Sequence, residues 1–219
     1  MKIAAAGLLA FSALTTACVN SSTLQTAKAL DPGHQRILVG GGFYSSPSIN
    51  ADANQASNGS VEALAMPYME LGYRRGIIDK LELGAKVTVP GTAGIDAKYQ
   101  FLDAGKFALA AGLGGGYLKL TSGSEGMEST SKIFDTTVPL YASYDIAKAF
   151  AVYTAPKYVL RYTSSVDSMG ASSSGLNHLV GATVGTRVGN RWGLFLETSY
   201  LKSVSSDFDA FQVNGSIFF

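Results

Sequence analysis

Several residue types are scarce in this chain of 219 residues. It has one cysteine and two histidines, and only 15% of its residues are charged. One cysteine cannot form an internal disulfide, and this set of residues offers no spacing typical of a metal site. The net charge of +1 gives no strong attraction to nucleic acid or to acidic partners. The scarcities therefore exclude a disulfide scaffold and argue against metal and nucleic-acid sites, and we expect no cofactor.

Long apolar runs are also missing. Hydrophobic residues make up 47% of the chain, yet no run of about 18 apolar residues follows the first few residues. A transmembrane helix is therefore not predicted. Abundant apolar residues without apolar runs indicate that apolar and polar residues alternate.

The N-terminus has the features of a signal peptide. Met1-Lys2 supplies a positive end, and a short apolar stretch runs from Ile3 to Leu14. The sequence LTTAC that ends at Cys18 resembles the bacterial lipoprotein box, in which the cysteine becomes the acylated first residue. The resemblance implies a signal peptide over 1–17 and a lipid on Cys18. Without it, Cys18 would be a stray residue near an ordinary cleavage site. The polar residues after it predict a lipidated tether over 18–34.

Ten later segments alternate apolar and polar residues at every second position, which is typical of β-strands. In KLELGAKVTV, for example, Leu83, Ala85 and Val87 share one face, and Glu82 and Lys86 share the other. Most of the segments are long enough to cross a bilayer as tilted strands. The expected strands are 35–46, 61–76, 79–90, 93–103, 105–120, 131–145, 148–163, 176–188, 191–204 and 207–219.

The connections between these segments nearly alternate in length. Those after the second, fourth, sixth and eighth segments are tight, whereas three others are long and polar, over 47–60, 122–131 and 164–175. Short turns at one end and long loops at the other are the layout of outer-membrane barrels.

Aromatic residues gather near the ends of the segments, as they do at membrane interfaces. One girdle is expected from Tyr73, Phe101, Phe107, Tyr144, Phe150, Trp192 and Phe219. A second is expected from Phe43, Tyr117, Phe134, Tyr162, Tyr200 and Phe208.

These patterns predict an all-β fold, a closed antiparallel up-and-down transmembrane β-barrel over 35–219. About ten strands are expected, and eight are possible if a hairpin is misassigned. In lipid every backbone polar group needs a partner inside the protein, and a closed barrel provides one. The alternative is a soluble, lipocalin-like carrier of an apolar ligand, in which the apolar face would point inward.

The last strand carries a second resemblance. Phe211, Val213, Gly215, Ile217 and Phe219 alternate up to a terminal aromatic residue, FQVNGSIFF. This is similar to the signal by which the barrel-assembly machinery recognises bacterial outer-membrane proteins. The body of the chain resembles small outer-membrane β-barrels in general. The resemblance implies an outer-membrane location, with outer-membrane lipids, the barrel-assembly machinery and the lipoprotein-processing machinery as partners.

Charged residues fall on the polar face of the strands, which would line the barrel. Ions in a narrow interior are costly unless they are paired. We therefore expect a salt-bridged, largely closed interior formed by Glu70, Arg74, Glu82, Lys86, Asp96, Lys98, Asp135, Lys157, Arg161, Arg187 and Glu197.

Candidates for catalysis are weak. His178 could meet an acid such as Asp207 or Asp209 at the outer rim, but no motif supports a catalytic set, and His34 falls in the expected tether. We therefore expect no enzyme. The sequence favours a structural or surface-interaction role, with a narrow channel or small-solute binder as the alternative.

Overall fold

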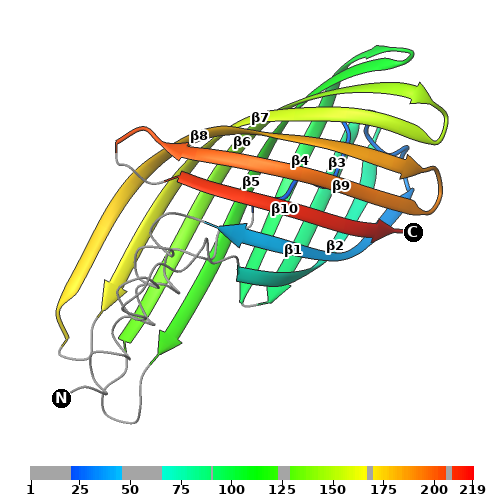
Figure 1. The fold of residues 1–219 in the computed structure, drawn as a ribbon. Helices are drawn as coiled ribbons and strands as arrows, with labels where there is room; N and C mark the ends of the chain where they lie inside the picture. The colour runs from blue at the N-terminus through cyan, green and yellow to red at the C-terminus, as the bar shows by residue number, and fades with distance from the viewer. Residues whose placement is uncertain (1–20, 46–65, 90, 123–128, 167–169, 206–208) are drawn as a thin grey trace.

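The computed structural model describes residues 21–45, 66–89, 91–122, 129–166, 170–205 and 209–219. They form a closed barrel in which each strand pairs with its neighbours in the chain and β1 pairs with β10 (Figure 1). The strands are β1 (Gln35–Ser45), β2 (Met66–Ile78), β3 (Leu81–Val89), β4 (Thr92–Ala104), β5 (Phe107–Ser122), β6 (Ser129–Ala147), β7 (Phe150–Val166), β8 (Ser172–Gly189), β9 (Gly193–Ser203) and β10 (Asp209–Phe218).

The predicted fold class is confirmed, with ten strands and not eight. All ten expected segments form strands, and their bounds differ by up to four residues where both bounds lie among the described residues. All neighbouring strands are antiparallel, including the closing pair, in which Leu38 lies opposite Phe218 and Ser45 opposite Phe211. Where all ten strands overlap the wall has no free sheet edge, so its backbone groups find their partners within it. In the described residues no helix is long and apolar enough to cross a membrane.

One predicted loop is much shorter than expected. β7 continues to Val166 and β8 begins at Ser172, so most of the expected loop 164–175 belongs to strands. Serine-rich sequence lacks the apolar alternation that we used to recognise strands, yet here Ser164, Ser165 and Val166 pair with Ser174, Ser173 and Ser172. Strands β5 to β8 therefore extend well past the ends of β1 and β10 (Figure 1).

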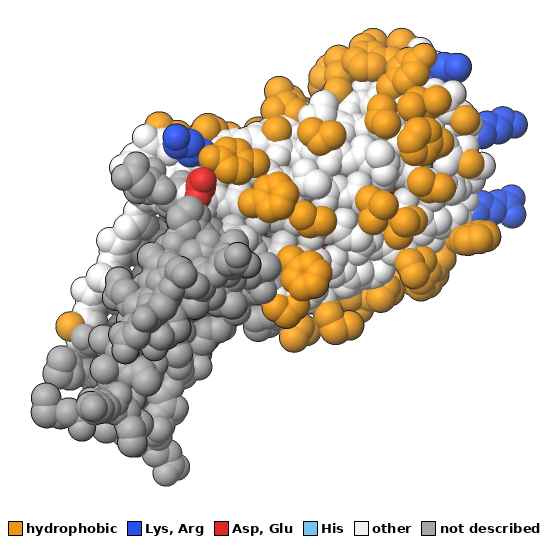
Figure 2. All heavy atoms as spheres, viewed as in Figure 1, with side chains coloured by type: hydrophobic (Ala, Val, Ile, Leu, Met, Phe, Trp, Pro, Cys, Tyr) orange, Lys and Arg blue, Asp and Glu red, His pale blue; other side chains and the backbone are white. Residues whose placement is uncertain are grey.

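The outer face of the barrel is apolar. Large hydrophobic side chains such as Ile95 (71% exposed), Val184 (61%) and Ile217 (58%) point away from the lumen. Figure 2 shows these side chains spread over the visible wall, with Lys and Arg side chains projecting from one end. A continuous apolar exterior suits lipid and not water, so the alternative of a soluble carrier with an inward apolar face is wrong.

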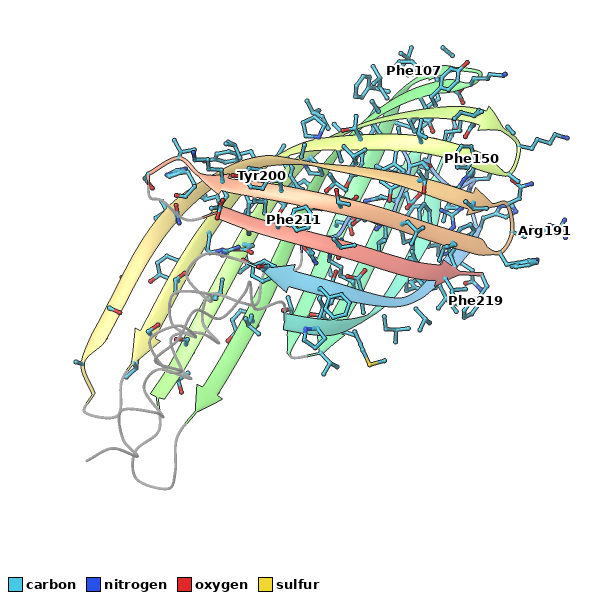
Figure 3. The ribbon with its side chains drawn as sticks, viewed as in Figure 1. Phe107, Phe150, Arg191, Tyr200, Phe211 and Phe219 are labelled. Carbon is cyan, nitrogen blue, oxygen red and sulfur yellow. The ribbon has the colours of Figure 1, made fainter. Side chains whose placement is uncertain are left out.

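Aromatic side chains mark the two ends of the apolar surface. Phe107, Phe150 and Phe219 lie near the end that carries the tight turns, whereas Tyr200 and Phe211 lie near the other end (Figure 3). All the residues expected in the two girdles point outward, except Phe208, which lies outside the described residues. We call the end with the tight turns periplasmic and the opposite end outer, following the layout of outer-membrane barrels.

Candidate functional site

The lumen of the barrel is the candidate site because its charged side chains converge there. Alternation along each strand points all eleven of the expected interior residues inward. Eight are buried: Glu70, Arg74, Glu82, Lys98, Asp135, Lys157, Arg161 and Glu197. The other three, Lys86, Asp96 and Arg187, are half-buried.

One ionic network joins β2, β3 and β4. Arg74 pairs with Glu82, and its Nη2 donates to Asp96 Oδ1 at 2.5 Å. Lys98 Nζ lies 3.2 Å from the other oxygen of Glu82. Gly84 provides room for this network, because a Cβ there would come within 2.6 Å of Arg74 Nη1. Four charges on three adjacent strands therefore cross-link one side of the wall from within.

Smaller pairs lie elsewhere in the lumen. Arg161 on β7 donates to both carboxylate oxygens of Asp135 on β6, at 3.0 and 3.3 Å. Near the periplasmic end, Arg187 Nη2 lies 3.4 Å from Asp145 Oδ1. Asp145 also binds Lys28 Nζ at 2.7 Å, and Lys28 comes from the N-terminal segment.

Residues 21–30 occupy the lumen, and we call them the luminal segment. Its backbone is held by side chains of the wall near the middle and the outer end. Thr23 N and Leu24 N donate to the carboxylate of Glu197 at 2.7 and 2.8 Å. Ser21 N donates to Gln212 Oε1 at 2.9 Å. An irregular segment has no strand partners, so these side chains supply the hydrogen bonds that its backbone needs.

The same arrangement continues toward the periplasmic end. Ala29 N donates to Gln100 Oε1 and Leu30 N to Glu82 Oε2, at 2.8 and 2.9 Å. In the opposite sense, Lys98 Nζ donates to the carbonyl oxygens of Thr26 and Lys28 at 2.9 and 3.1 Å. Lys98 and Glu82 thus belong both to the wall's ionic network and to the attachment of the luminal segment.

Apolar contacts add to this attachment. Leu24 is 3% exposed and lies in a buried cluster with Leu38, Tyr153, Phe195 and Phe218. Leu38, Phe195 and Phe218 belong to β1, β9 and β10, so the cluster lies beside the seam where β1 pairs with β10. The guanidinium of Arg36 lies over the ring of Phe218, 4.9 Å from its centre.

The chain from Ser21 to Gly33 runs along the lumen from its outer half to the periplasmic end. Gly33 N donates to Gly76 O beside the tight turn between β2 and β3, which is periplasmic. Ser22 Oγ donates to Glu70 at 2.5 Å, and Glu70 pairs with Thr88, one residue before the outer end of β3. Ser21 therefore lies in the outer half of the lumen.

The luminal position of residues 21–30 corrects the expectation of a tether over 18–34. Of the residues described there, Leu24, Gln25, Thr26 and Ala27 are at most 4% exposed, so this part of the chain is enclosed and not solvated. Its composition is polar because its partners in the lumen are polar. Cys18 and the expected signal peptide lie outside the described residues.

A small space remains beside the luminal segment. It has a volume of about 100 Å³ and lies between Ser21–Gln25 and the inner faces of β2 to β7. Lys86, Asp96 and Asp135 are among its polar lining residues. The space is too small for a continuous aqueous path of the kind found in large porins.

The histidines do not join a catalytic set in the described part of the chain. His178 points outward from β8 and its Nδ1 is hydrogen-bonded to Tyr158 Oη. Asp209 instead accepts a hydrogen bond from Tyr200 Oη at 3.3 Å, and Asp207 lies outside the described residues. His34 is exposed at the periplasmic end. No group of acidic, histidine or cysteine side chains that could hold a metal is found among the described residues.

The five residues of the expected assembly signal share the outer face of the end of the chain. Four are large apolar side chains that are 42–58% exposed, and Gly215 is half-buried. The residues between them are buried in the lumen: Gln212, Asn214, Ser216 and Phe218. Sequence reasoning did not single out these residues, although Gln212 accepts a hydrogen bond from the luminal segment and Asn214 donates one to Glu197.

Comparison with proteins of known structure identifies the type of barrel. No family model matches the chain, and no curated protein matches it. Among solved structures, the outer membrane protease OmpT from Escherichia coli gives a TM-score of 0.51 at 10% identity, over 88% of this chain and 98% of OmpT. This likeness shows the same barrel fold. Together with the apolar exterior and the closed wall, it decides the class. The chain has the fold of a bacterial outer-membrane β-barrel.

Two other solved barrels are similar over most of their length. Neisserial surface protein A gives a TM-score of 0.42 at 9% identity, over 84% of this chain and 95% of that chain. The attachment invasion locus protein Ail of Yersinia pestis gives 0.45 at 11% identity, over 86% and 99%. At these identities, no activity is transferred to this outer-membrane barrel.

Proposed function

We propose that this protein is a closed outer-membrane barrel with a structural or surface-interaction role, and that the luminal segment closes it. The observation that carries the proposal is the set of hydrogen bonds from Thr23, Leu24 and Leu30 to the buried carboxylates Glu197 and Glu82. A solute would have to break these bonds and displace the segment to pass.

The described charged side chains of the lumen are not arranged as in a selective pore. Selective channels use rings of one sign, whereas acids and bases here alternate and pair with each other. Paired ions in a narrow lumen stabilise one closed geometry. Because their charges cancel, they do not attract a passing ion of either sign. The narrow-channel alternative is therefore the less favoured one.

Two further assignments complete the proposal. Cys18 is acylated after removal of residues 1–17, on the strength of the LTTAC sequence. The outward row from Phe211 to Phe219 is read by the barrel-assembly machinery. The protein needs no cofactor and performs no catalysis in this proposal.

Conductance in a planar lipid bilayer tests the closed lumen. We expect no steady single-channel current from the full-length protein. Leu24→Asp should conduct, because a carboxylate would enter the apolar cluster around Leu24 and lie close to Glu197, which repels it. Ser131→Ala is the matched control: Ser131 is equally buried in the lumen but bonds Ser165 and not the luminal segment.

Both variants must first retain the mobility shift on boiling that marks a folded barrel in detergent. A steady current through the unmodified protein would contradict the proposal and favour the channel. A folded but silent Leu24→Asp variant would show that the luminal segment is not what closes the barrel.

A further inference from the structure

Two lysines face each other on the outer surface of the barrel. Lys119 on β5 lies directly opposite Lys132 on β6, and both side chains are exposed. Like charges directly opposite each other destabilise a sheet. No ion pair or hydrogen bond joins either ammonium group to another side chain in the described part of the chain. Among the described residues, the pair thus places two positive charges at one point of the wall without an acidic partner.

The opposite side of the barrel has a similar arrangement in which an acidic residue lies opposite the lysine. There Tyr200 on β9 pairs with Phe211 on β10, and the next outward pair along the strands is Lys202 with Asp209. On β5 and β6, Tyr117 pairs with Phe134, and the next outward pair is Lys119 with Lys132. At both sites an aromatic pair is followed, one outward pair further along the strands, by a pair of charged residues. The sites differ in that Asp209 stands on one side of the barrel where a second lysine stands on the other.

An apolar groove lies directly below the two lysines on the lipid-facing wall. It has a volume of about 1020 Å³ and spans β2 to β6, and Tyr117 and Phe134 form part of its lining. Its lining includes the small residues Ala85, Ala93 and Gly115. A Cβ on Gly115 would meet no atom closer than 4.0 Å, so packing does not require glycine there. The glycine leaves space that a ligand can fill.

We propose that this surface binds a phosphorylated lipid of the outer leaflet, with its phosphate between Lys119 and Lys132 and an acyl chain in the groove over Gly115. Aromatic rings such as Tyr117 and Phe134 lie at the membrane interface, so the ammonium groups one pair further out reach the depth of the headgroups. A phosphate there accepts charge-assisted hydrogen bonds from both lysines and removes their mutual repulsion.

The charge and the groove together identify a lipid as the occupant. A free phosphate would use the lysines but leave the groove empty, and an uncharged lipid would fill the groove but leave the lysines uncompensated. Ser164 on β7 lies opposite Lys132 in the same outward row and provides a hydroxyl donor beside the pair. Its presence extends the polar edge of the site above the apolar groove.

Native mass spectrometry of the detergent-purified full-length protein tests the site, with diphosphorylated lipid A as the probe. We expect bound lipid A to fall by roughly fivefold for each lysine removed in Lys119→Gln, Lys132→Gln and the double variant. Lys202→Gln is the matched control and should leave binding unchanged, because Lys202 already faces Asp209. Gly115→Leu should weaken binding of lipid A while the barrel keeps its mobility shift on boiling.

Competition experiments separate the contributions that the phosphate charge and the acyl chain make to lipid binding. Inorganic phosphate should fail to displace lipid A, and phosphatidylethanolamine should bind more weakly. The proposal is overturned if Lys202→Gln and the double variant lower binding equally, since the effect would then be general surface charge. It is also overturned if inorganic phosphate competes fully, or if Gly115→Leu has no effect, since either result would remove the acyl chain from the site.

Discussion

Glu82 is the residue on which the interior of the barrel depends most directly. Its side chain is 1% exposed and has three partners: Arg74, Lys98 and the backbone N of Leu30. It therefore links β2, β3 and β4 of the wall to the luminal segment. A buried carboxylate is tolerated in this position because two cations and a backbone donor replace its lost hydration.

Replacing Glu82 with glutamine should be costly. The change keeps the size of the side chain but leaves Lys98 buried without its counter-ion, which we expect to lower the free energy of unfolding by about 3 kcal/mol. Urea unfolding in detergent, followed by the mobility shift, measures this. Asp79→Asn in the exposed turn before β3 is the control and should change stability by less than about 0.5 kcal/mol. Equal losses would mean that the buried network contributes no special stability.

Along a single strand, position decides whether a side chain meets lipid, lumen or the membrane interface. On β9, Leu196 points outward at 50% exposure in the middle of the apolar surface, and Tyr200 points outward near the outer end. Between them lie Glu197 and Ser199, which are 2% exposed and face the lumen. One strand therefore samples all three environments within five residues.

Lysine substitutions on β9 should show this depth dependence. Leu196→Lys should cost about 2–4 kcal/mol because it places a charge near the middle of the bilayer, whereas Tyr200→Lys should cost about 0–1 kcal/mol near the interface. Reversible unfolding from lipid vesicles would give both values. Similar costs at the two positions would show that the apolar surface is not oriented across the membrane as described.

The strands could be predicted from sequence, whereas the luminal segment could not. Alternation at every second residue is a local property, so KLELGAKVTV predicted both the β3 strand and its lumen-facing Glu82 and Lys86. Residues 21–30 have no such period. Their position depends on Gln100, Glu197 and Gln212, which come from three separate strands and meet only in the folded barrel.

At the scale of the whole molecule, the two ends of the described chain lie at opposite ends of the barrel. Phe219 is periplasmic, beside Ile37, and Ser21 lies in the outer half of the lumen. Ten strands return the chain to the periplasmic end, and the luminal segment adds one further passage. An odd number of passages places the two ends on different sides.

Antibody labelling of intact cells can show on which side of the membrane each end of the chain lies. An epitope inserted directly before Ser21 should bind antibody without permeabilisation, whereas the same epitope in the β8–β9 turn between Asn190 and Arg191 should bind only after it. Only protein that keeps its mobility shift on boiling counts in either case. Labelling of the first epitope solely in permeabilised cells would contradict the direction of the luminal segment.

The luminal segment also sets a condition on how the barrel is made. Its hydrogen-bond acceptors Glu197 and Gln212 belong to β9 and β10, the last strands to be synthesised. Until those strands arrive, the segment has only part of its partners, and once β10 has joined β1 the wall leaves no lateral way in. Closure of the seam and enclosure of the segment are therefore one event, and a nascent barrel that sealed while empty would be a dead-end product.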